Sequence, residues 1–193
     1  MPSINRREGR SPVSSWKRGP AASPALDSRR TLVAWMLASV ALPMRAATTP
    51  SQPRGKVVLT ITNLVGQPNA PADTQFDMAM IKALPQHSFV TRTPWFAAPV
   101  QFTGPLLRDV LSAAHANGSR LRAIALNDYR VDLPFEDVER HDVLLAHLLD
   151  DRPMTVRDKG PLFVIYPFDS KAELRNALYY SRAAWQLRTI EVS

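Results

Sequence analysis

The sequence predicts a mixed α+β domain in which short strands outnumber helices. Apolar residues make up 45% of the 193 residues, enough for the core of one domain. Several short β-branched or alternating stretches are bounded by Pro, Gly, Asn or Asp, which is typical of strands ending in turns. Only two or three stretches have helical periodicity. This mixture favours a single β-rich α+β domain.

The first half of the domain is expected to contain strands and one clear helix. The helix covers Pro105–Ala116, where Leu and Val recur on one face and Asn117-Gly118 supplies the stop. The other expected elements are a strand at Lys56–Asn63, a loop at Val65–Thr74, a short strand with one helical turn at Phe76–Leu84, and a strand at His87–Thr93.

The second half begins with two strands, Leu121–Leu126 and Tyr129–Pro134, separated by the turn-forming pair Asn127-Asp128. The next apolar stretch, Asp142–Leu149, fits either a buried strand or a helix, because periodicity does not separate the two. The remaining expected elements are a buried strand at Leu162–Tyr166, a helix at Lys171–Tyr180 and a closing strand at Trp185–Val192.

The charge of the chain is concentrated at its N-terminal end. Residues 1–47 contain eight Lys or Arg and two Asp or Glu, and the rest contains 16 and 15, so the net charge of +7 comes almost wholly from this leader. A nearly neutral body does not suggest a nucleic-acid partner. We expect a disordered leader with a signal peptide at 1–47, a linker at 48–55 and the folded domain at 56–193.

The leader predicts export in a bacterium. Arg29-Arg30 precede the 12-residue apolar run Thr31–Leu42 and then small residues, an arrangement typical of a cleaved signal peptide. The run is short for a membrane span. "SRRTLV" fits a twin-arginine signal, and the general secretory route fits the same residues. Either route predicts a periplasmic or secreted protein.

The composition excludes several kinds of chemistry. Cysteine is absent, which removes disulfides, thiolate nucleophiles and cysteine-ligated metals. The four histidines lack a metal-protease spacing, so no metal site is expected. The carboxylate pairs Glu136-Asp137 and Asp150-Asp151 lie beside prolines and are interpreted as solvated turns. No phosphate loop or serine nucleophile motif is present.

Four stretches nevertheless form an ordered set: "TPWFAAPVQFTGPLLRDVL", "ALNDYRVDLP", "DDRPMTVRDKGPLFVIYP" and "WQLRTIEV". Together they resemble the oxidoreductase molybdopterin-binding domain, the central domain of sulfite oxidases and of periplasmic methionine-sulfoxide reductases. The resemblance covers roughly residues 56–193 and is greatest to short, single-domain exported members. It implies a sulfite oxidase-like α+β fold in which a pterin dithiolene and one protein cysteine ligate molybdenum.

The sequence departs from this pattern where the cysteine is expected. The corresponding stretch is "SFVTRTPWF", which offers Thr91, Arg92 and Thr93 but no thiolate. A hydroxyl or a guanidinium does not replace a soft sulfur donor. Molybdopterin is therefore a cofactor that the resemblance implies and the residues present do not support.

The resemblance also places candidate ligand-binding residues at the edge of a cofactor cleft: Trp95, Asn127, Asp128, Tyr129, Arg157 and Lys159. Arg157 and Lys159 can hold a phosphate or carboxylate, and Trp95 can form an aromatic wall. An alternative interpretation makes Arg157-Asp158-Lys159 a solvated turn of mutually paired charges. It also makes Asn127-Asp128 an Asx turn and Trp95 a core residue.

The sequence thus predicts an exported binding module for a small anionic or pterin-like ligand, acting as an accessory or sensory subunit with a periplasmic or membrane-bound partner protein. The alternative is a true molybdopterin-dependent oxidoreductase with a non-cysteine metal environment, so enzymatic activity stays open. A third interpretation is a scaffold that kept the fold for protein–protein contacts.

Overall fold

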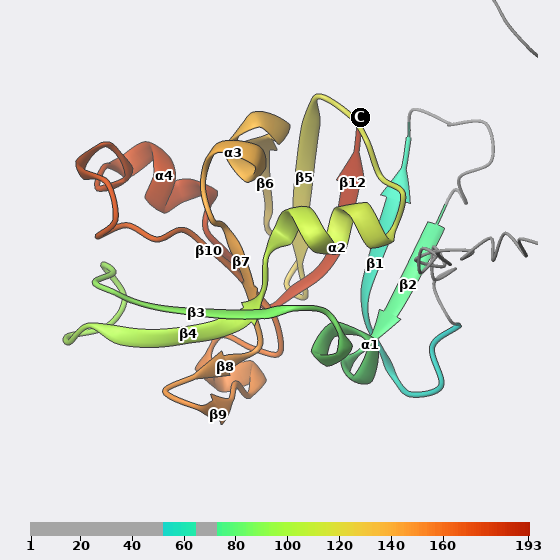
Figure 1. The fold of residues 1–193 in the computed structure, drawn as a ribbon, viewed down its shortest axis with the longest axis horizontal. Helices are drawn as coiled ribbons and strands as arrows, with labels where there is room; N and C mark the ends of the chain where they lie inside the picture. The colour runs from blue at the N-terminus through green and yellow to red at the C-terminus, as the bar shows by residue number, and fades with distance from the viewer. Residues whose placement is uncertain (1–51, 65–72) are drawn as a thin grey trace, which may run out of the picture. The chain divides into compact units, whose positions relative to one another are not determined.

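The computed structural model describes residues 52–64 and 73–193, shown as the coloured ribbon in Figure 1. The predictions for the leader, for residues 48–51 of the linker and for residues 65–72 of the expected loop lie outside the described residues. The last two residues of that loop, Asp73 and Thr74, belong to a strand. Among the described residues, no helix is both long and apolar enough to span a bilayer.

A five-stranded sheet contains both the first and the last strand of the domain (Figure 1). The two are adjacent and parallel, with Thr60 opposite Thr189, whereas the other neighbouring strands are antiparallel. In spatial order the strands are β2 (Asp73–Asp77), β1 (Val57–Asn63), β12 (Leu187–Val192), β5 (Arg120–Ala125) and β6 (Arg130–Pro134).

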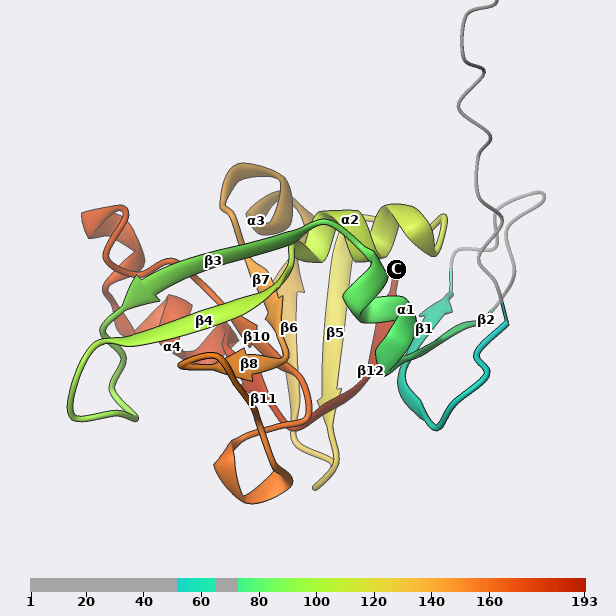
Figure 2. The ribbon, with the colours of Figure 1, turned by 60° about the horizontal axis from the view of Figure 1, so that its bottom comes forward.

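Two smaller sheets complete the β-structure. The first contains the hairpin of β3 and β4, which runs across the strands of the large sheet in Figures 1 and 2. Its strands are β3 (Gln86–Thr91), β4 (Val100–Pro105), β8 (Leu148–Leu149) and β9 (Arg152–Pro153). The second consists of β11 (Ala184–Trp185), β10 (Phe163–Ile165) and β7 (Leu144–Ala146).

The helices are short and are fixed by local capping. Asp77 accepts the amide hydrogen of Met80 at the start of the first helix, and this bond, with a second one from Gly55, lowers the pKa of Asp77 despite its burial. The helices are α1 (Met78–Ala83), α2 (Leu107–Ala113), α3 (Phe135–Arg140) and α4 (Ala177–Arg182), with 3₁₀ turns η1 (Val156–Asp158) and η2 (Ala172–Leu174).

The core runs continuously between the large sheet, α2 and the two small sheets. All three residues of β10 are buried and belong to this core. This is expected for a short apolar strand that lies between other elements. The largest fully buried side chains are Tyr166, Phe76, Phe102, Phe163 and Phe168.

Most expected elements are present, and three expectations were wrong. Residues 100–105, for which no strand was expected, form β4, so Pro105 ends a strand and does not open the helix. Gly104 permits this close packing, because a Cβ there would lie 2.1 Å from the carbonyl oxygen of Leu145. The expected helix at 171–180 is divided into η2 and α4, since Asn176 caps a new helix with its side chain.

The third correction concerns Glu136-Asp137, which was interpreted as a solvated turn. The pair belongs to α3, and Asp137 is buried. The open choice for Asp142–Leu149 is settled in favour of strand, as β7 and β8. The structure is thus the β-rich α+β fold that the sequence predicts.

Candidate ligand-binding site

Gln186 joins two of the segments on which site residues were predicted. It lies between β11 and β12 with φ of 53°, and its backbone carbonyl accepts the amide hydrogen of Leu126 at 2.8 Å. Its backbone amide donates to the carbonyl of Lys159 at 3.0 Å, and its side-chain amide donates to the carbonyl of Val156 at 2.7 Å. The turn after β5 and the loop containing Lys159 are therefore held beside each other.

An open groove of about 390 Å³ lies near this junction. Two predicted residues, Trp95 and Tyr129, line it together. Its full lining is Pro94, Trp95, Tyr129, Ala177, Tyr180, Ser181, Ala183 and Trp185, and we refer to it as the aromatic groove. Four aromatic side chains around a concave surface of this size are typical of a small-molecule site.

Trp95 is at once a wall of the aromatic groove and part of the core. Its ring packs at centroid distances of 5.4 Å from Trp185 and 5.7 Å from Phe163, and at 6.3 Å from both Phe168 and Tyr180. Three of these four contacts are edge-to-face, the arrangement that aromatic pairs prefer. The Trp95 side of the groove is therefore rigid, because its ring is fixed by the neighbouring rings.

Lys159 contacts the groove through Trp185. Its ammonium nitrogen lies 4.3 Å from the centre of the Trp185 ring and 6.0 Å from that of Phe96, which is cation–π geometry. Lys159 has φ of 68° as the residue that ends η1. Its positive charge therefore lies on a ring of the groove wall, although Lys159 is not itself among the lining residues.

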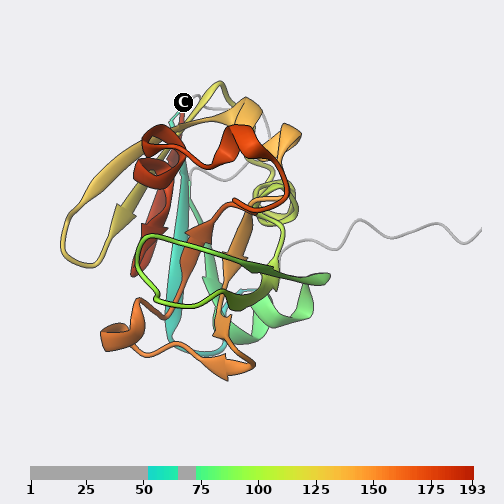
Figure 3. The same cartoon turned by 90° about the vertical axis from the view of Figure 1, so that its left-hand side faces the viewer.

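Arg157 does not join this arrangement. It is exposed in η1, and within the described part of the chain it has no ion pair or side-chain hydrogen bond. Figure 3 shows η1 and α4 at opposite ends of the fold. Asp158 bonds to the hydroxyl of Thr155, so the mutual charge pairing considered for Arg157, Asp158 and Lys159 is not what holds this turn.

The turn between β5 and β6 contains the other predicted residues. Asn127 accepts the backbone amide hydrogen of Tyr129 at 3.2 Å, which confirms the Asx-turn interpretation. Asp128 has φ of 63° and its exposed carboxylate pairs with Arg188. Both side chains therefore shape the turn, and Tyr129, 48% exposed, is the residue that the turn presents to the groove.

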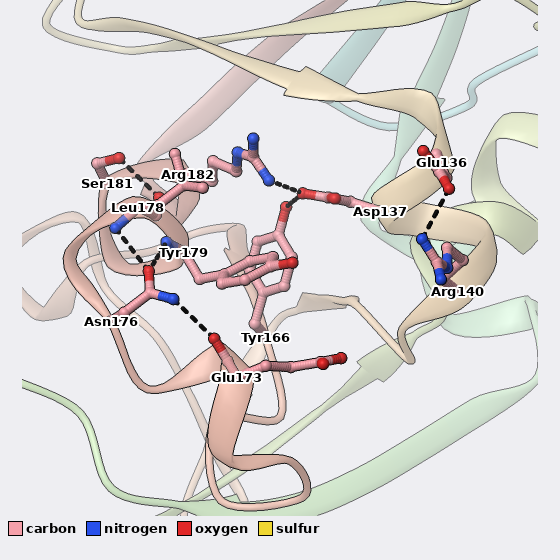
Figure 4. Close-up of polar contacts among 10 residues, drawn as sticks. All are labelled: Glu136, Asp137, Arg140, Tyr166, Glu173, Asn176, Leu178, Tyr179, Ser181 and Arg182. Atoms are coloured by element: carbon pink, nitrogen blue, oxygen red, sulfur yellow. Dashed lines mark hydrogen bonds and ion pairs between the residues drawn. The ribbon is translucent and has the colours of Figure 1, made fainter.

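A buried polar cluster that the sequence analysis missed anchors α4, which forms one side of the groove (Figure 4). Asp137 accepts hydrogen bonds from the hydroxyl of Tyr166 at 2.9 Å and from Arg182 at 2.7 Å. Burial, and then the neighbouring Asp137 charge, raise the pKa of Tyr166, so it stays a neutral donor. The sequence contained one indication of this cluster: Asp137 lies in a stretch after Pro134 that could form a helix.

The residues at the expected cysteine position do not fit a thiolate-ligated molybdenum. Thr91 is fully buried, and its hydroxyl accepts the amide hydrogen of Asp169 at 3.1 Å and lies 3.4 Å from the carbonyl of Arg92. The hydroxyl thus serves the backbone, and it is a hard donor where a soft one is needed. Across residues 52–64 and 73–193, no three His, Asp or Glu side chains gather as a metal site.

The fold is a β-rich α+β domain that is distantly similar to the fold of a molybdopterin oxidoreductase. Among solved structures, the sulfane dehydrogenase SoxCD from Paracoccus pantotrophus is similar, with a TM-score of 0.53 and 16% sequence identity. The match covers 69% of this chain and 37% of that chain, so this protein spans little more than a third of its neighbour. At this identity the likeness shows the fold alone. No family model and no curated protein matches the chain.

Proposed function

We propose that this protein is an exported, sulfite oxidase-like domain that binds a flat, anionic, pterin-like small molecule in the aromatic groove and acts as an accessory or sensory module. The observation that carries the proposal is the groove itself, in which Trp95, Tyr129 and Trp185 present aromatic surface and the Lys159 ammonium lies over the Trp185 ring. The absence of cysteine from the sequence separates this role from thiolate-ligated molybdenum chemistry.

The chemistry of the groove favours a planar ligand. Stacking of a heteroaromatic ring on a protein aromatic ring contributes about 1–3 kcal/mol. Tyr129 is half exposed and has no ring partner among the described residues, so one face is free to stack. Lys159 supplies a point charge for a phosphate or carboxylate that projects from the ring system.

The export and partner parts of the proposal rest on other features. The Arg29-Arg30 sequence and the following apolar run support export to the periplasm by either signal-peptide route. An accessory or sensory role suits a single binding domain that acts through a periplasmic or membrane-bound partner protein.

Fluorescence anisotropy of pterin-6-carboxylate, titrated with the full chain, tests the groove. The expected result is saturable binding that Tyr129→Ala weakens about tenfold, the equivalent of a lost stacking contact. Lys159→Gln is expected to weaken the carboxylate ligand more than uncharged pterin. Leu178→Ala is the matched control, since this exposed apolar residue of α4 does not line the groove.

Two results would oppose the proposal. If Tyr129→Ala left the affinity for the pterin unchanged, the ligand would bind outside the aromatic groove. If no saturable binding were observed, the scaffold interpretation would be favoured. Metal and pterin analysis of protein exported in a host that makes molybdenum cofactor tests the alternative. Molybdenum and pterin near one equivalent would favour the oxidoreductase with a non-cysteine metal environment.

A further inference from the structure

A second cavity, with a different character, is lined in part by the hairpin strand β3. It has a volume of about 380 Å³ and shares no lining residue with the aromatic groove. Three cations, Arg108, Arg140 and Lys171, line it against a single carboxylate, that of Asp142. We call it the basic pocket; its full lining is His87, Ser88, Phe89, Leu106, Arg108, Arg140, His141, Asp142, Leu144, Pro167, Ser170 and Lys171.

We propose that the basic pocket binds a small organic anion, with its phosphate or carboxylate head held by Lys171, Arg140 and Arg108 and its apolar part against Phe89 and Leu144. The proposal goes beyond the function proposed for the aromatic groove and does not depend on it. It rests on the state of Lys171, on the weakness of the neighbouring ion pairs, and on the walls of the pocket.

Lys171 is held in place by a backbone carbonyl and an imidazole nitrogen. Its ammonium nitrogen lies 3.4 Å from the carbonyl oxygen of Arg140 and 3.4 Å from Nδ1 of His141, and within the described part of the chain it pairs with no carboxylate. An ammonium has three N–H donors, so one remains for a ligand. The pocket therefore contains a positioned cation whose charge is not neutralised.

His141 makes this arrangement rigid. Its ring is 94% buried and packs edge-to-face on Tyr179 at 5.6 Å, with Tyr166 at 6.5 Å. Because an ammonium group can only donate, Nδ1 of His141 is the acceptor in its contact with Lys171. His141 thus positions the Lys171 ammonium through a buried ring nitrogen.

The two arginines are paired but remain available. Arg140 bonds to Glu136 at 2.8 Å, as Figure 4 shows, and Arg108 bonds to Asp142 at 2.9 Å. Both pairs are largely exposed, and exposed pairs contribute little to stability. Each guanidinium has five N–H donors, so a ligand oxyanion can be accommodated beside the existing partner.

The walls of the pocket indicate that the ligand is more than an inorganic ion. Leu106, Leu144 and Pro167 are buried residues that contribute an apolar floor, with Phe89 beside them. A volume of about 380 Å³ holds a small organic molecule. The hydroxyl of Ser170 donates to the carbonyl of Pro167, which leaves its oxygen free to accept a hydrogen bond.

Calorimetric titration of the full chain with phenyl phosphate, benzoate and inorganic phosphate tests the proposal. Phenyl phosphate is expected to bind more tightly than inorganic phosphate, because only the former reaches the apolar floor. Comparison with benzoate distinguishes a phosphate site from a carboxylate site. Lys171→Gln is expected to weaken binding about tenfold, the usual equivalent of a charge-assisted hydrogen bond. Lys171→Arg is expected to restore part of it.

The control is Arg122→Gln, which removes a cation that is paired with Asp132 on the large sheet and does not line the basic pocket. Equal weakening by Lys171→Gln and Arg122→Gln would show nonspecific attraction to positive charge and overturn the proposal. Absence of saturable heat with all three anions would overturn it as well. Amide chemical shifts of Ser88 and Ser170 that do not move with bound phenyl phosphate would place the ligand elsewhere and have the same consequence.

Discussion

The substitution Arg182→Met tests whether the buried cluster beneath α4 stabilises the fold. Arg182 and Asp137 lie 2.7 Å apart, with side chains only 17% and 10% exposed. Removal of the arginine leaves the carboxylate buried with one remaining side-chain donor, the Tyr166 hydroxyl. Breaking a buried pair in this way costs about 3–5 kcal/mol. Methionine keeps much of the aliphatic stem of Arg182 but not the guanidinium, which also lies 5.3 Å from the centre of the Tyr179 ring, so the lost charge dominates the effect.

Equilibrium urea unfolding of the full chain at neutral pH measures this cost. The matched control is Arg122→Met, because Arg122 makes an ion pair of nearly the same length, 2.8 Å, with Asp132 in solvent. The control is expected to change the free energy of unfolding little. If Arg182→Met cost no more than Arg122→Met, the argument that burial makes the Asp137 cluster a stabilising anchor would be refuted.

Two further predictions concern other parts of the fold. Gly104→Ala should lower the free energy of unfolding by at least about 2 kcal/mol, because the new methyl group would meet the backbone of Leu145. Gly55→Ala, where the nearest atom is 3.4 Å away, is the control for calorimetric melting; equal shifts would contradict the packing argument. Burial, helped by the charge of Lys82, lowers the pKa of His147 below 6.5. The unfolded chain then binds more protons below pH 6.5, so stability should fall as the pH falls from there towards the folded pKa. His147→Gln should remove that part of the pH dependence, whereas His87→Gln, which alters an exposed side chain, should retain it.

The candidate site was predictable where local sequence chemistry decides the structure. Asn127 forms the Asx turn that its residue type predicts, and the turn presents Tyr129 to solvent as a result. Trp95 was predicted as an aromatic wall or a core residue; it packs on core rings and lines the aromatic groove, and its part in ligand binding stays a prediction. Arg157 and Lys159 were predicted to hold the same ligand, but Lys159 ends η1 and lies over Trp185, whereas Arg157 is exposed within η1. Their closeness in sequence does not reveal this difference.

The sequence by itself determined the β-rich α+β class, most of the strands and the lack of a thiolate for molybdenum, because alternation, turn residues and composition are local properties. Only the tertiary structure decided which segments meet. The bonds of Gln186 join the turn after β5 to the loop of Lys159, and residues 29 positions apart, Asp137 and Tyr166, share a buried hydrogen bond. Both contacts join segments that are distant in the sequence. Asp137 looked like part of a solvated turn in the sequence, but because it is buried, its bond with Arg182 anchors α4.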